Sequence, residues 1–144
     1  MNINNNGFWI RDGILELWLR FAALHLEDQP DDQSPVHTIR NQWLLASRGF
    51  FTGCVPLELA ANVATPEGRT AVVNAIDSLL NALRRGPARL DRGVLNLLGI
   101  GGFGVDIDAA QLIEVGEALL DLINGKRFGG PSNTEFMPGC RREA

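Results

Sequence analysis

Residues 65–86 read TPEGRTAVVNAIDSLLNALRRG, and this stretch decides the fold. Thr65, Pro66 and Glu67 are typical of a helix start: the hydroxyl caps, proline suits the first turn, and an acid complements the positive end of the helix dipole. Large apolar residues then recur at helical spacing: Val72, Ile76, Leu79, Leu80 and Leu83. Gly86, followed by Pro87, ends the pattern. The stretch therefore predicts a helix over 65–85 with one apolar face.

The sequence on both sides has the same helical spacing. Ser34 and Pro35 open a second helix, and Asp106 or Asp108 caps a last one whose apolar face includes Gly116. A missing side chain on that face predicts the close approach of another helix. We expect an all-α, single-domain bundle of four main helices joined by short helical connectors. The four helices are expected over 8–27, 35–51, 65–85 and 108–124.

Two segments with weaker secondary-structure signals complete the predicted fold. Residues 90–98 are expected to form a short helix capped by Asp91, because no second stretch alternates with period two to pair with a strand there. The end of the chain is rich in glycine, proline and polar residues. We therefore expect a helical domain over 1–125 and an irregular tail over 126–144.

Composition excludes several classes of protein. The 144 residues are enough for one domain, and 45% hydrophobic with 21% charged residues is typical of a globular chain. A net charge of −4 does not favour coating nucleic acid or an anionic membrane. The first residues, MNINNN, lack the basic and apolar parts of a signal peptide. We expect a cytoplasmic protein with neither nucleic acid nor membrane as a partner.

The glycine-rich run Gly99–Gly104 formally satisfies GxGxxG. In a dinucleotide site those glycines let backbone amides approach a pyrophosphate between a strand and a helix. Here no alternation of strands and helices surrounds the run, and Asp106 or Asp108 puts an acid where phosphate would bind. The run is therefore interpreted as a flexible turn between helices that binds no dinucleotide.

The sequence has few residues suited to binding a metal ion or to acting as a catalytic nucleophile. The soft ligands are His25, His37, Cys54 and Cys140, and no two share a CxxC spacing or a helical face. No serine lies in a GxSxG motif, and neither cysteine has a histidine near it in sequence. We expect no catalytic residue, no cofactor and no metal, although carboxylates from separate helices can still converge in space.

Two groups of residues are candidates for binding. Arg40 and Ser47 fall within the apolar arc of the second helix together with Trp43. Arg40 there either pairs with a buried carboxylate in a structural role, reaches the edge of the core, or binds a carboxylate or phosphate on a partner. Arg84 and Arg85 belong to a basic cluster that complements a helix dipole or contacts an acidic protein or phosphate.

The first helix is apolar over most of its circumference. If it is central, other helices surround it and no patch remains. If it is peripheral, Trp9, Leu15, Leu19 and Leu26 stay exposed and form an interface with a second copy or another protein. We favour the interface.

These observations lead to two alternative functions. The first is a non-enzymatic protein-binding module, such as a bacterial adaptor or a toxin-neutralising protein of the immunity type, whose partner is another protein or a second copy. The alternative is a small-ligand-binding protein or enzyme with a pocket near Arg40 and the Gly99–Gly104 loop. A deep pocket with convergent polar groups would favour the alternative.

Overall fold

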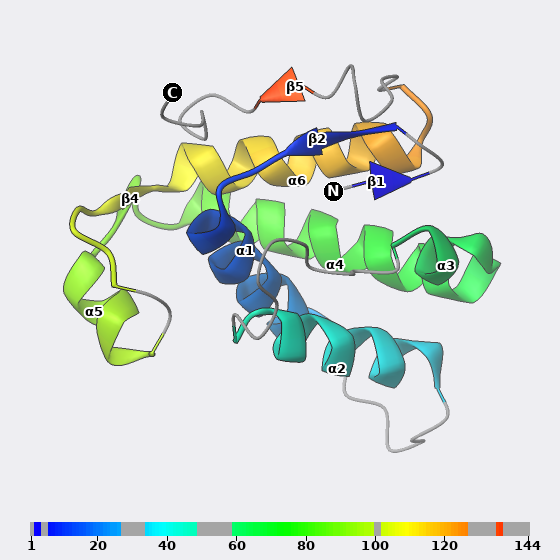
Figure 1. Cartoon of the computed structure of the whole chain (residues 1–144), viewed down its shortest axis with the longest axis horizontal. Coiled ribbons are helices and arrows are strands. Elements are labelled where there is room, and N and C mark those ends of the chain that lie inside the picture. Colours follow the sequence, from blue (N-terminus) through cyan, green and yellow to red (C-terminus); the bar gives the residue numbers. More distant parts are fainter. Residues whose placement is uncertain are drawn as a thin grey trace.

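A computed structural model describes residues 2–3, 6–26, 34–48, 59–99, 102–126 and 135–136. The described part is mostly helical, so the prediction of an all-α single domain is confirmed. Its helices are α1 (Asp12–Leu24), α2 (Pro35–Ala46), α3 (Leu59–Ala64), α4 (Pro66–Arg85), α5 (Arg92–Leu97) and α6 (Ala109–Ile123). In Figure 1, α4 and α6 lie next to each other, α1 crosses them, and α2 packs beneath α1.

Short strands occur that the hydropathy pattern did not predict. The strands are β1 (Asn2–Ile3), β2 (Asn6–Trp9), β3 (Arg89–Leu90), β4 (Ile107–Asp108) and β5 (Glu135–Phe136). β2 pairs antiparallel with β1 and parallel with β5, and β3 pairs antiparallel with β4. Each strand has two to four residues, which is too short to show an alternating pattern.

The first helix begins later than predicted. α1 starts at Asp12 with Arg11 at the N-cap, rather than at the predicted residue 8. Residues 6–9 instead form β2, because their backbone groups pair with β1 and β5. Phe8 and Ile10 are nevertheless buried in the core, so the apolar residues before the helix keep the environment that their hydropathy predicts.

α1 is the central helix of the bundle, and this overturns the prediction of a peripheral first helix. It contacts α2, α4 and α6. Leu19 is 0% exposed, and Leu15 and Leu26 are also buried. The expectation that these three leucines stay exposed is therefore wrong, because the elements packed around α1 cover them, whereas Leu24 at the end of the helix remains exposed. The side chain of Trp9 lies outside the described residues.

The contact between α4 and α6 confirms two predictions. The Thr65 hydroxyl accepts a hydrogen bond from Gly68 N at 3.1 Å, so the predicted cap starts α4. A Cβ atom on Gly116 would lie 2.7 Å from Leu80 Cδ2 on α4. The glycine therefore permits the close helix approach that its place on the apolar face predicted.

The remaining predictions have mixed outcomes. The short helix expected near residues 90–98 is present as α5, with Asp91 as its cap. α2 ends at Ala46, before the predicted residue 51, and the description stops at residue 48. Cys54, Cys140 and nearly all of the predicted tail lie outside the described residues.

Candidate functional site

The chain makes an excursion between α4 and α6, and this segment carries four of the six large exposed hydrophobic residues in the described part of the structure. The chain leaves α4 through β3, forms α5, and returns through β4 to start α6. Arg89 pairs with Asp108 and Leu90 with Ile107, so the strands close the excursion at its base. In Figure 1, α5 lies at one end of the molecule, apart from the four long helices. We call residues 89–108 the α5 arm.

Polar contacts hold the arm in one shape. Asp91 Oδ1 accepts a hydrogen bond from Val94 N at 3.0 Å, and Asp106 Oδ1 accepts one from Arg92 N at 3.0 Å. Asn96 binds the backbone of Phe103 in both directions, because its amide donates to Phe103 O at 3.1 Å and its oxygen accepts from Phe103 N at 2.8 Å. These hydrogen bonds lie within and between the two described segments of the arm, 89–99 and 102–108.

Few side chains attach the arm to the core. Leu95 and Ile107 are buried, and Phe103 is half-buried. A Cβ atom on Gly13 of α1 would lie 3.8 Å from Phe103 Cε1, which places the phenyl ring against the start of α1. One face of α5 thus packs inward through Leu95 while the other faces solvent.

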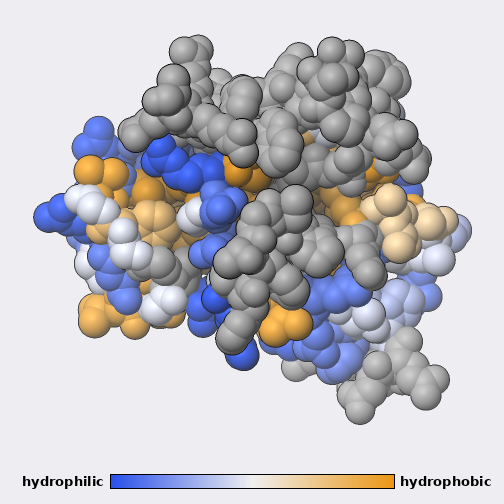
Figure 2. All heavy atoms as spheres, viewed as in Figure 1, coloured by the Kyte–Doolittle hydropathy of each residue, from blue (hydrophilic) through white to orange (hydrophobic). Residues whose placement is uncertain are grey.

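The outer face of the arm is apolar. Leu97 is 88% exposed, and Val94, Leu98 and Val105 are also more than half exposed. Val94, Leu97 and Leu98 are spaced i, i+3 and i+4, so they share one face of the helix. Figure 2 shows hydrophobic residues among hydrophilic ones at the end of the molecule where Figure 1 places α5. We call Val94, Leu97, Leu98 and Val105 the α5 surface.

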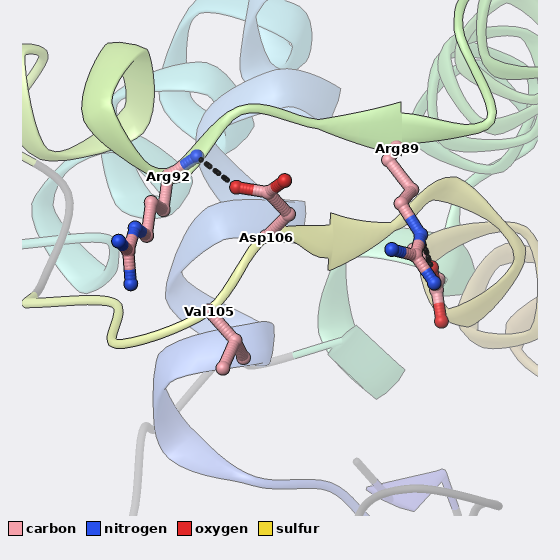
Figure 3. A pocket seen from close by; sticks show the side chains of 5 residues that line it. Arg89, Arg92, Val105 and Asp106 are labelled. Atoms are coloured by element: carbon pink, nitrogen blue, oxygen red, sulfur yellow. Dashed lines mark hydrogen bonds and ion pairs between the residues drawn. The ribbon is translucent and has the colours of Figure 1, made fainter.

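A polar hollow of about 360 Å³ lies beside this surface. Arg89, Arg92, Val105, Asp106 and Asp108 line it, and Figure 3 shows both arginine side chains on the same side of the ribbon as Val105. Arg89 Nε is 3.2 Å from Asp108 Oδ1, and Arg92 donates to the Gly104 carbonyl. The charges of two arginines and two aspartates balance, so the hollow has no strong preference for a free anion.

A second hollow, of about 200 Å³, is apolar. Residues of α1, α4, β3 and the turn between α4 and β3 line it. His25, at its edge, is hydrogen-bonded through Nδ1 to Ser78 Oγ at 2.8 Å. We call this the apolar hollow; its lining residues are Phe21, Leu24, His25, Leu79, Ala82, Leu83, Gly86, Pro87 and Leu90.

The candidate residues on α2 lie mainly in the core. Trp43 is 1% exposed, and its ring centroid lies 6.0 Å from that of Trp18. Ser47 is buried and its hydroxyl donates to Leu44 O at 2.7 Å. Arg40 is half-buried, with its Nε out of contact with solvent. Arg40 lines neither of the two hollows described above, so a ligand pocket near it and its pairing with a carboxylate both stay predictions.

The structure does not bring the other candidates together with these. Arg84 and Arg85 lie exposed in the last turn of α4, as the dipole argument predicts. Arg84 Nη2 is 2.8 Å from Glu117 Oε1, and Arg85 Nε donates to Asn81 O at 3.2 Å. Leu15 and Leu19 belong to the core and present no surface to a partner.

The predicted chemistry of the Gly99–Gly104 run is not tested. The run follows α5, a helix, whereas a dinucleotide-binding run follows a strand. Gly99 has a φ of +71°, the left-handed conformation that commonly ends a helix. Residues 100 and 101 lie outside the description, and the prediction that the run binds no dinucleotide stays a prediction.

Within the described ranges, no cluster of three or more metal-ligating side chains is found, and no helix is long and apolar enough to cross a membrane. Burial raises the pKa of the Glu16 carboxyl above its usual value, and the charge of Asp12 adds to the rise.

The hydropathy analysis missed the residues of the α5 surface. Apolar residues occupy positions 94, 95, 97 and 98, on more than one side of a six-residue helix. That is the same excess of apolar residues that suggested an interface on the first helix. The helix within residues 92–98 is too short to be enclosed by other helices. The same criterion, an excess of apolar residues around a helix, would therefore have predicted an exposed apolar surface there.

Three comparisons with known proteins were made for the whole chain. No family model, no curated protein and no solved structure matches it.

Proposed function

We propose that this chain is a non-enzymatic, cytoplasmic protein-binding module that docks a polypeptide on the α5 surface. The observation that carries the proposal is the concentration of exposed apolar side chains on one fixed arm. Large exposed hydrophobic residues elsewhere in the described part are Leu24 and Leu45, and the other four make up the α5 surface. Contiguous exposed apolar patches on soluble domains are typical of interaction sites.

The construction of the arm supports this role. The side chains of Asp91, Asn96 and Asp106 form hydrogen bonds with backbone groups of the arm itself. A surface ordered before binding loses less conformational entropy when a partner docks. An adaptor or a toxin-neutralising protein would use such a surface, and the size and acidic charge of the chain suit both classes.

The test compares three versions of the chain as bait in cells of its source. The wild type, Leu97→Ser and Leu45→Ser are each tagged, and captured polypeptides are quantified by mass spectrometry. Leu45 is an exposed leucine on α2 and is the matched control. We expect at least one polypeptide, the untagged chain included, to be recovered about tenfold less with Leu97→Ser and equally with Leu45→Ser.

The candidate must then bind the purified wild-type chain in calorimetry and bind Leu97→Ser more weakly. If the three baits recover the same polypeptides in the same amounts, the α5 surface is not a docking site. Circular dichroism of each variant confirms that the helical content is retained, so that a loss of binding is not a loss of folding.

A further inference from the structure

We infer that the partner of the α5 surface is a second copy of this chain, and that Leu97 of each protomer fills the apolar hollow of the other. The inference rests on the proposed function and names the occupant of that same surface. A protruding apolar face and an open apolar hollow occur on one chain. A two-fold axis lets each protomer supply both.

The hollow has the size that this occupant requires. Its volume is about 200 Å³, and an apolar cavity of about 150 Å³ accommodates a benzene molecule. A leucine side chain has four carbon atoms against six in benzene, so the volume of the hollow is sufficient for Leu97. Its lining is almost entirely apolar, with Leu24 exposed at the rim to extend the contact.

The arm does not fill the hollow of its own chain. Leu90 of β3 lines the hollow, but no residue of α5 does, and Leu97 remains 88% exposed. Arg89 and Leu90 point to opposite faces of the ribbon, so the polar hollow and the apolar hollow lie on different sides of β3. The apolar face and the apolar hollow are thus both available to another molecule.

The charges of the arm favour a second copy over other partners. Both signs lie close together on the arm, in Arg89, Arg92, Asp91, Asp106 and Asp108. A patch of one sign would repel itself across a two-fold axis, whereas a patch of mixed sign can pair with its own copy. The mixture, with a net charge of −4 on the chain, gives no attraction to an anionic membrane.

Reciprocal docking uses two contacts in place of one. A specific interface usually buries about 800 Å² on each partner, of which somewhat more than half is apolar. In a two-fold dimer each protomer contributes both its α5 surface and its apolar hollow, so the buried area comes from two contacts.

Two variants and two matched controls test the inference on the full chain. Leu97→Ser removes the protruding side chain, and Ala82→Phe fills the hollow from α4. The controls are Leu45→Ser, an exposed leucine elsewhere, and Asn81→Phe, which adds the same ring one residue outside the hollow. Sedimentation equilibrium gives the dimer dissociation constant, and circular dichroism checks that each variant is folded.

We expect the wild type and both controls to dimerise with similar affinity. Leu97→Ser and Ala82→Phe should each raise the dimer dissociation constant at least about tenfold, the effect typical of a central contact residue. A wild type that stays monomeric at all concentrations overturns the inference. So does a dimer that tolerates either variant, because the protruding residue or the hollow is then not used.

Mixing the two variants gives a sharper result. Each variant alone lacks both reciprocal contacts, but in a mixed dimer Leu97 of the Ala82→Phe chain can enter the intact hollow of the Leu97→Ser chain. In an equimolar mixture, native mass spectrometry should therefore show mixed dimer well above twice the amount of either variant homodimer, which is the ratio that random pairing gives. A 1:2:1 ratio of the three species would contradict docking of Leu97 in the hollow.

The two proposals fail in different ways. If the chain is monomeric but another polypeptide is captured in a Leu97-dependent manner, the inferred occupant is wrong and the docking function stands. If anionic vesicles bind the chain through Leu97 and no polypeptide does, both are wrong.

Discussion

Gly116 on α6 allows a quantitative test of the packing between α4 and α6. In Gly116→Ala, the new methyl group would lie 2.7 Å from Leu80 Cδ2 and 3.2 Å from Leu80 Cγ. Leu80 is buried, so its side chain cannot swing into solvent to make room. Overpacking of this kind costs about 1–3 kcal/mol of unfolding free energy. Alanine in place of glycine regains about 0.8–1.0 kcal/mol of helix propensity. We expect a net destabilisation of about 1 kcal/mol.

The effect of Gly116→Ala on the free energy of unfolding should change sign when the Leu80 side chain is truncated. In a Leu80→Ala background the clashing atoms are gone, and the added methyl group fills part of the cavity that the truncation leaves. There, Gly116→Ala should stabilise by about 1 kcal/mol, so the coupling between the two positions is about 2 kcal/mol. Gly13→Ala in α1 is the matched control, because its methyl group would meet only Phe103 Cε1 at 3.8 Å.

Urea unfolding at one fixed protein concentration measures these differences. Trp18 and Trp43 are buried, so their fluorescence reports loss of the core. The reasoning is refuted if Gly116→Ala stabilises the wild type as Gly13→Ala does. It is also refuted if the effect of Gly116→Ala is the same in both backgrounds.

Two further predictions concern α1 and α4. The raised pKa of Glu16 means that the folded state favours the protonated carboxyl. The stability that this carboxyl contributes is present below its unfolded pKa and is lost as pH rises through its raised folded pKa. In urea unfolding, Glu16→Gln should therefore stabilise the protein more at pH 7 than at pH 4. Thr65→Ala should cost about 1 kcal/mol in the same assay because it removes the cap on Gly68 N, whereas Ser34→Ala should cost less because Ser34 makes no side-chain cap bond to α2.

The helices that could be predicted are those whose signals are local. Thr65, the apolar spacing after it and Gly86 all lie within one segment, and α4 has the predicted bounds to within one residue. The start of α1 depends instead on a distant partner, because Phe8 pairs with Glu135 of β5. No local pattern contains that information, so residues 8 and 9 lie in a strand where a helix was predicted.

Burial was harder to predict than helix position. The apolar excess of α1 is satisfied because three long helices surround it, and Leu19 is fully buried as a result. The apolar excess of α5 is not satisfied, because six residues at the end of an excursion present only one face to the bundle. The same pattern therefore has opposite outcomes, and the difference lies in the tertiary arrangement.

The closed base of the α5 arm predicts that the bundle can fold without the arm. Leu90 and Ile107 are paired across the ribbon, so a two-residue Asn-Gly turn can join them directly as a hairpin. A chain in which Asn-Gly replaces residues 91–106 loses the burial of Leu95, worth about 1.5–3 kcal/mol, and the smaller contact of Phe103 with α1. Shortening the connection eightfold regains about 1.8 kcal/mol of loop-closure entropy.

The lost burial and the regained loop-closure entropy nearly offset each other. The free energy of unfolding of the shortened chain should therefore lie within about 2 kcal/mol of that of the full chain, and the bundle helices should be retained. Circular dichroism and urea unfolding measure both properties. The shortened chain should also neither dimerise nor capture a partner, because it lacks the α5 surface while retaining the apolar hollow. If it does not fold, the arm is part of the core. If it folds and still binds, the exposed leucines of the arm have no role in docking.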